Sequence, residues 1–323
     1  MNRLSFKRLL LPAMAIGGAI AINNSISRAA SKGLLKNTNG KFFRWKLGTV
    51  YYTRTGSGKE PLLLIHDTAE YSSSYEWIFL LPYLKEQYTV YTLDLPGCGR
   101  SDKPSVEYTN YMYVQLISTF INEIIRKDFR ESVRPYVCTT GRSGSAAVMA
   151  SYLEPQLFRG IVMINPLSPV KLQKPLNRYA KFLRFLLAVP VFGTLLYYSE
   201  TSRNKLEYLL KEKGFYNPFL VQKNTIDAFY EASHMYEGSG KNLYASLKCG
   251  YTNWNIRKAV SSLSVPTAIL QGSALSKKDS VLHAYRKLNS GILSRIIPET
   301  NYYPQLENPS ATAEVLMNVL SGM

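Results

Sequence analysis

The sequence predicts an α/β protein with a mainly parallel sheet covered by helices on both faces. Short continuous apolar runs, such as Pro61–His66 and Gly160–Pro166, are typical of strands buried on both faces. They alternate with segments of helical periodicity such as Tyr111–Lys127, and this alternation indicates parallel strands joined by helical crossovers. The 323 residues, 46% of them hydrophobic, suffice for one large domain, or one domain with an insertion.

The elements are expected in the following order. The globular part begins near Lys41 with a hairpin that turns at Leu47-Gly48. The strands expected after this hairpin are Pro61–His66, Tyr88–Asp94, Tyr136–Thr140, Gly160–Pro166, Val265–Gly272 and Ile292–Glu299. The expected helices are Tyr75–Lys85, Tyr111–Lys127, one beginning near Gly144, Asp279–Leu288 and Ala311–Leu320.

One long segment interrupts this alternation and divides the chain. Residues 167–255 are helical in pattern, aromatic and basic, without a strand of the buried kind. We therefore expect a sheet domain made of residues 41–166 and 256–323, with residues 167–255 forming a helical lid. The lid should cover the carboxyl ends of the strands. Residues 1–40 precede the sheet domain as an anchor or signal segment and a tether.

The net charge of +17 is concentrated in two regions. Residues 1–60 carry eleven Lys and Arg against one acid, and residues 166–255 carry twelve against six. This distribution predicts attraction to an anionic membrane surface, and no nucleic-acid-binding motif accompanies it. The three cysteines lack metal-ligand spacing. We expect neither a metal nor a cofactor.

The N-terminus has a basic start and then an apolar run of fourteen residues ending at Ile22. That length suits a signal-peptide core and is short for a full membrane span. An uncleaved anchor is favoured; a cleaved signal and a docked segment are the alternatives. In the lid, Tyr179–Tyr198 is apolar and aromatic, and it either packs on the sheet domain or also contacts the bilayer. We expect a membrane-associated protein, on an unspecified side of the membrane.

The segment Gly141–Ser145 is the main candidate for chemistry. It joins the strand Tyr136–Thr140 to a small-residue helix, as in a nucleophile elbow, where a sharp turn lifts one side chain above the sheet. This interpretation makes Ser143 the nucleophile, flanked by Arg142 and Gly144. The alternative is an ordinary loop rich in glycine and serine.

Four motifs occur together in a fixed order: Ile65-His66-Asp67, Asp94-Leu95-Pro96-Gly97-Cys98-Gly99-Arg100-Ser101-Asp102-Lys103-Pro104, Gly141–Ser145, and Tyr303-Pro304-Gln305-Leu306-Glu307-Asn308-Pro309. In this respect the chain from Lys41 onward resembles the α/β-hydrolases of the esterase, haloperoxidase and epoxide-hydrolase grouping. The resemblance implies the fold and, where the catalytic residues are kept, acyl transfer by a serine, a histidine and an acid. A lid over an apolar pocket would suit a small apolar or ester-like ligand.

The resemblance also implies where the catalytic partners should stand. Gly144 would supply one oxyanion amide and the segment His66-Asp67-Thr68 the other, although the Asp67 carboxylate would oppose an oxyanion. The family histidine position is Tyr302, whose phenol is a poor base at neutral pH. The family acid position is Leu275. Asp279 is expected to be an exposed helix-start residue, and the other family acid site reads Asn165-Pro166.

Three histidines remain as possible bases. His234, with Glu231 one turn before it, could reach the pocket from the lid; His66 is expected to shape the oxyanion loop, and His283 to be structural. Two functions therefore stay open. One is a serine hydrolase that acts through Ser143 with a rearranged base. The other is a catalytically inactive homologue that serves as a membrane-associated binding or interaction protein.

Overall fold

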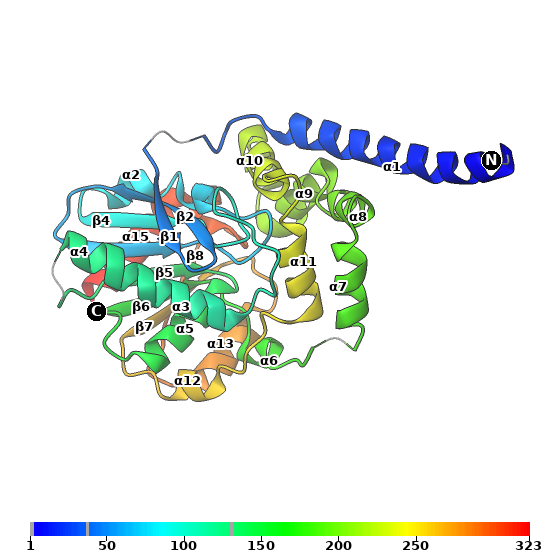
Figure 1. The fold of residues 1–323 in the computed structure, drawn as a ribbon. Coiled ribbons are helices and arrows are strands. Elements are labelled where there is room, and N and C mark those ends of the chain that lie inside the picture. Colours follow the sequence, from blue (N-terminus) through cyan, green and yellow to red (C-terminus); the bar gives the residue numbers. More distant parts are fainter. Residues whose placement is uncertain (1–2, 37–38, 130–131, 177) are drawn as a thin grey trace.

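The computed structural model of the chain describes residues 3–36, 39–129, 132–176 and 178–323. Its centre is an eight-stranded sheet with the order β1-β2-β4-β3-β5-β6-β7-β8 (Figure 1). The strands are β1 (Lys41–Trp45), β2 (Gly48–Thr55), β3 (Glu60–Ile65), β4 (Tyr88–Leu93), β5 (Tyr136–Thr140), β6 (Gly160–Ile164), β7 (Thr267–Gly272) and β8 (Leu293–Ile297). β1 and β2 pair antiparallel with their neighbours, and the other strands are parallel. This confirms the predicted fold class.

Successive side chains of the central strands enter two different cores. On β3, Leu63 and Ile65 belong to one apolar cluster, whereas Leu62 and Leu64 belong to the other. The first cluster is covered by α3 (Asn110–Phe120), α5 (Ser143–Leu153), α12 (Arg257–Ser261) and α13 (Lys278–Arg286). The second is covered by α2 (Leu81–Leu84) and α15 (Pro309–Ser321). Burial on both faces explains why these strands read as uninterrupted apolar runs.

Two expected helices differ from the prediction. Residues 75–85 form a 3-10 turn, η1 (Ser74–Trp77), and the short helix α2, which has Pro82 in its first turn. Proline has no amide hydrogen and cannot sit in a helix interior, so it starts a new helix. The helix α3 continues through a π-helical turn, η2 (Ile121–Ile125), into α4 (Arg126–Asp128).

Between β6 and β7 the described chain forms helices joined by turns and loops, and no strand. It forms α6 (Pro169–Leu172), α7 (Ala180–Ala188), α8 (Phe192–Glu200), α9 (Arg203–Leu209), η3 (Leu210–Gly214), η4 (Pro218–Leu220), α10 (Lys223–His234), α11 (Lys241–Cys249) and α12. We call the part up to Asn255 the lid. Figure 1 shows α7 to α11 gathered on one side of the sheet domain. The last short helix, α14 (Pro304–Glu307), precedes α15.

The N-terminal helix α1 (Arg3–Ala30) lies against the lid and its first half extends away from the body (Figure 1). Asn23 donates a hydrogen bond from its side-chain amide to the carbonyl of Val191, between α7 and α8, at 3.1 Å. No single helix among the described residues is long and apolar enough to span a membrane. The helical segments Ala180–Ala188 and Phe192–Gly214 reach that length and hydropathy only when taken together, and they are bent by 108° relative to one another.

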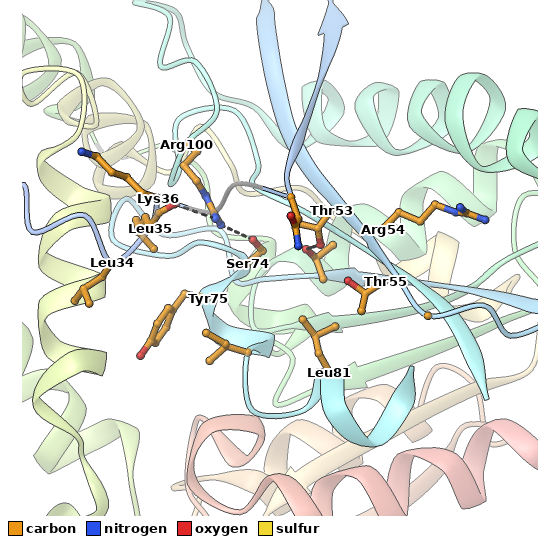
Figure 2. A pocket seen from close by; sticks show the side chains of 14 residues that line it. Leu34, Leu35, Lys36, Thr53, Arg54, Thr55, Ser74, Tyr75, Leu81 and Arg100 are labelled. Carbon is orange, nitrogen blue, oxygen red and sulfur yellow. Dashed lines mark hydrogen bonds between the residues drawn. The ribbon is translucent and has the colours of Figure 1, made fainter. Parts of the chain in front are cut away.

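The residues after α1, which we call the tether (Lys32–Lys36), are bound to lid and core alike. The ammonium of Lys32 pairs with Asp227 at 3.0 Å, and the Glu231 carboxylate accepts the amides of Gly33 and Leu34 at 3.1 and 2.8 Å. Arg100 of the core donates to the carbonyl of Leu35, whose side chain is buried (Figure 2). The lid helix α10 is thereby fastened to the N-terminal segment.

A cavity of about 600 Å³ opens beside the tether, between Lys36 and β2 (Figure 2). Arg100 crosses its floor, held by Asp94 at 2.7 Å and bonded to the Ser74 hydroxyl. Its other polar lining residues are Thr53, Thr55 and Arg54 of β2, Thr92 of β4, Lys36, Asn39 and Tyr75. This cavity shares no lining residue with the site described below.

Candidate functional site

The turn between β5 and α5 has its apex at Gly141. This residue adopts a φ of +54°, a conformation that side chains of L-residues rarely take, and Ser143 already lies in the first turn of α5. A Cβ atom at Gly141 would press against the Tyr302 hydroxyl and the Asp67 carboxyl group. In a nucleophile elbow the apex carries the nucleophile. The sequence prediction, which put Ser143 at the apex, is therefore displaced by two residues.

Ser143 points back into the sheet. Its hydroxyl donates to the carbonyl of Thr140 at 2.7 Å and lies 3.3 Å from the carbonyl of Ile65, and the residue is only 1% exposed. It lines none of the cavities described here. Gly144, the expected oxyanion donor, lies next in the helix and faces Met163. A serine whose hydroxyl donates to main-chain carbonyls, with no imidazole as acceptor, lacks the activation that acyl transfer requires.

Asp67 occupies the space above the apex. One carboxylate oxygen accepts the amide of Arg142 at 2.7 Å, and the other accepts the hydroxyl of Tyr302 at 2.6 Å. The Arg142 amide follows the apex residue directly, so it is the main-chain donor that an elbow of this kind would offer to an oxyanion. The side chain of Asp67, which follows β3, already fills that place with a negative charge.

The hydroxyl of Tyr302 lies beside the apex residue Gly141. Burial raises its pKa well above 10, and the Asp67 carboxylate raises it further, so the phenol stays protonated and acts as a donor. The side-chain amide of Asn165, at the end of β6, donates to the carbonyls of Asn301 and Tyr302 at 2.9 Å. Asn165 therefore holds this loop where another family member would place an acid. Asp279 is exposed in the first turn of α13, and Leu275 is half-buried.

His66 is fully buried and both of its ring nitrogens are engaged. Nε2 accepts the amide of Leu95 at 2.9 Å, and Nδ1 lies 2.7 Å from the carbonyl of Asp67, to which it donates. Burial lowers the pKa of His66, which keeps the ring neutral. His66 thus links the loop after β3 to the loop after β4, and because its Nε2 lone pair is already used, it has no free site for a substrate proton.

His234 is buried inside the lid and does not line the cavity beside the apex. Its ring stacks on Tyr198 with a centroid separation of 4.4 Å, and Nδ1 lies 2.9 Å from the carbonyl of Tyr230. Burial lowers its pKa to about 4. The expectation that His234 reaches the pocket from the lid is therefore wrong, because the face of α10 that carries His234 packs against Tyr198 of α8. His283 is exposed on α13.

Glu76 is a buried carboxyl group that the sequence did not single out. Its Oε2 accepts the hydroxyl of Thr140 at 2.8 Å and the amide of Asp67 at 3.3 Å, beneath the apex. Burial, and then the charge of Asp67, raise its pKa to about 8. Burial also raises the pKa of Glu70 to about 7. Two carboxyl groups, Asp67 and Glu76, thus contact the turn, and Glu76 and Glu70 hold protons near neutral pH.

A cavity of about 750 Å³, which we call the lid–core cavity, lies between the lid and the apex. Asp67, Thr68, Arg142 and Tyr302 form its floor, and its apolar walls include Leu167, Leu206, Leu209 and Leu247. The lining is less apolar than expected, because five basic side chains also face it: Arg142, Lys171, Lys205, Lys213 and Lys248. Among the residues that the structure describes, no three His, Cys, Asp or Glu side chains are grouped to hold a metal ion.

Comparison with known proteins identifies the family. The model of the alpha/beta hydrolase family matches residues 62–315, so the chain belongs to that family. A soluble epoxide hydrolase from Corynebacterium sp. (strain C12) is 36% identical over 76 residues, 24% of either chain. A 2-hydroxy-6-oxo-6-(2'-aminophenyl)hexa-2,4-dienoic acid hydrolase from Metapseudomonas resinovorans is 27% identical over 115 residues, 35% of this chain and 38% of that one. These alignments therefore span only about a quarter and two fifths of the relatives.

Solved structures show the same fold. A serine hydrolase involved in carbazole degradation superposes with a TM-score of 0.70 at 19% identity, covering 88% of this chain and 99% of that one. A bacterial membrane phospholipase A superposes with a TM-score of 0.68 at 20% identity, covering 100% and 99%. The relatives are hydrolases by name. Whether this chain retains their chemistry depends on its own site residues.

Proposed function

We propose that this protein is a non-hydrolytic member of the α/β-hydrolase family that binds a small ligand in its lid–core cavity. One observation carries the proposal: the Asp67 carboxylate accepts the Arg142 amide beside an apex that is glycine. Acyl transfer needs a nucleophile at the apex and a free oxyanion donor above it. Here the first is absent and the second is taken.

The histidines of the described chain support the same proposal. A general base needs a lone pair within reach of the nucleophile and a pKa near the working pH. The Nε2 lone pair of His66 is occupied, His234 is inside the lid, and His283 is on the surface. The phenol of Tyr302 stays protonated and donates a hydrogen bond to Asp67, so it cannot serve as a base.

A fluorophosphonate probe and p-nitrophenyl esters test this proposal on the purified full-length protein. We expect no labelling, and no ester turnover above that of the Ser143→Ala variant, which should lose little stability because it removes one buried hydroxyl. Turnover or labelling that disappears in Ser143→Ala would overturn the proposal and restore the serine-hydrolase alternative. Turnover that survives in Ser143→Ala but disappears in Asp67→Asn would instead make Asp67 the reacting group.

We also propose that the protein is held on an anionic membrane by α1 and by the lid. Phe182, Phe185 and Phe192 on α7 and α8 are 66%, 68% and 51% exposed. They lie on the part of the lid to which α1 is bonded through Asn23. Aromatic side chains next to basic residues favour the interface of an anionic bilayer. The first half of α1 points away from the sheet domain on this side (Figure 1).

Liposome flotation tests the contribution of the lid in the full-length chain. We expect Phe182→Ser/Phe185→Ser/Phe192→Ser to weaken binding to anionic vesicles. A matched triple variant at exposed aromatic positions elsewhere, Phe42→Ser/Tyr83→Ser/Tyr111→Ser, should not. Truncation before Lys41 is a poorer test, because it removes the tether from Asp227 and Glu231. If both triple variants float as the unchanged protein does, the lid does not contribute to membrane binding, and α1 alone attaches the protein.

A further inference from the structure

The basic side chains of the lid–core cavity are mostly without acidic partners. Lys205 pairs with Glu200 at 2.8 Å. Among the described residues, the other four basic groups of the lining form no ion pair: Arg142, Lys171, Lys213 and Lys248. Basic side chains that are solvated on an open surface need no acidic partner. These four basic side chains, however, all line the lid–core cavity of about 750 Å³.

The acids of the same cavity offset only part of this charge. Five basic side chains face three acids: Asp67, Glu70 and Glu200. Glu200 is paired with Lys205, and burial raises the pKa of Glu70 to about 7, so Glu70 is partly protonated at neutral pH. The basic groups also repel one another. Partial burial lowers the pKa of Lys171, and the charges of Arg142 and Lys174 lower it further. An anion placed among them would relieve that repulsion.

The remaining walls are apolar or aromatic. Leu206 and Leu209 come from α9, Leu247 from α11 and Leu167 from the chain after β6, while Tyr208 and Tyr244 join them. A ligand that satisfies both kinds of wall has an anionic group and an apolar part. Clefts that combine a few charged groups with apolar walls bind such molecules in one orientation.

We propose that the lid–core cavity binds an amphiphilic anion, a carboxylate or phosphate monoester with an apolar chain, through Arg142, Lys171, Lys213 and Lys248. This inference rests on the proposed function, because it names the ligand class of the same cavity. The Arg142 guanidinium is steadied for this role by a hydrogen bond from Nη1 to the Asn253 side chain at 3.0 Å. The three lysines belong to α6, η3 and α11, so contacts to all of them draw the lid onto the ligand.

Calorimetric titration of the full-length protein, in nanodiscs of zwitterionic lipid, tests the ligand class. The probes are octanoate, octyl phosphate, octanol as the neutral match and inorganic phosphate as the chainless match. We expect both amphiphilic anions to bind at least about tenfold more tightly than octanol or inorganic phosphate, since one charge contact and one apolar chain each contribute about a factor of ten or more. Octanol that binds as tightly as octanoate would overturn the proposal.

Variants locate the site. Lys171→Gln/Lys213→Gln/Lys248→Gln should weaken octanoate at least tenfold and leave octanol unchanged. Lys223→Gln/Lys258→Gln/Lys287→Gln removes the same charge from exposed positions outside the cavity and should bind octanoate normally. Equal weakening by both triple variants would mean that net charge alone acts, which also overturns the site. Ester turnover through Ser143 would refute the non-hydrolytic function without changing these affinities, so the two failures are distinguishable.

Discussion

Replacing Asp67 probes the arrangement on which the proposed function rests. Asp67→Ala leaves the Arg142 amide and the Tyr302 hydroxyl without their acceptor in a region that is only 7% exposed at Asp67. Hydrogen bonds to a charged group contribute about 1.5–3 kcal/mol each, and release of the carboxylate from burial offsets part of the sum. We expect the free energy of unfolding to fall by about 2–4 kcal/mol. With about 2 cal/mol/K of unfolding entropy per residue, a chain of 323 residues should lose about 3–6 °C in Tm.

The matched variant is Asp67→Asn. Its side-chain oxygen can still accept the Arg142 amide, and its amide can donate to the phenol oxygen of Tyr302, so the loss should be only about 1 kcal/mol. Scanning calorimetry of both variants measures the difference. A melting temperature of Asp67→Ala at or above that of the wild type would refute the reasoning. It would show that burying the Asp67 carboxylate costs more free energy than its two hydrogen bonds contribute.

Two further outcomes follow from buried and bridging carboxyl groups. Glu76 has a folded pKa of about 8 against an ordinary 4.5, so the folded state keeps a proton that the unfolded chain releases, and stability falls as the pH rises between these values. The free energy of unfolding of Glu76→Gln should therefore rise, relative to that of the wild type, by up to about 1.4 kcal/mol per pH unit in this range. If the difference between the two proteins is the same at pH 5 and at pH 8, the raised pKa of Glu76 is contradicted. Glu231→Ala should speed hydrogen exchange of the Gly33 and Leu34 amides, whereas Glu212→Ala, exposed in η3, should leave it unchanged; equal protection in both variants would show that the tether does not depend on Glu231.

The sheet could be predicted because its strands carry a local signal. Apolar runs such as Pro61–His66 are buried on both faces, and the alternation of strands with helical segments leaves few topologies for a parallel sheet. The single helix expected over residues 75–85 was wrong because Pro82 cannot occupy a helix interior and starts the separate helix α2. Here the sequence contained the correcting signal, since proline marks the first turn of α2.

The site was harder to predict. Two overlapping five-residue windows, Thr139–Ser143 and Gly141–Ser145, both carry small residues around a central position, and only the backbone decides which centre is the apex. Glycine at 141 was the available clue, since a φ of +54° suits it better than serine. No local sequence pattern predicts the contact between Asp67 and Tyr302, because these residues are 235 positions apart in the sequence. The charged lining of the cavity likewise arises only when the lid folds over the sheet.

Gly141, Asp67 and Tyr302 constitute one arrangement in which each residue requires the other two. A serine at 141 would place its Cβ against the Asp67 carboxyl group and the Tyr302 hydroxyl, so Gly141→Ser alone must displace both. Tyr302→His alone would set an imidazole beside Asp67, but with no nucleophile to deprotonate. We therefore expect neither single substitution to give ester turnover, and Gly141→Ser/Asp67→Gly/Tyr302→His to be the smallest set that opens the Arg142 amide and supplies a nucleophile with a base. Turnover by Gly141→Ser alone would show that the pocket had kept its catalytic shape and had lost only its nucleophile.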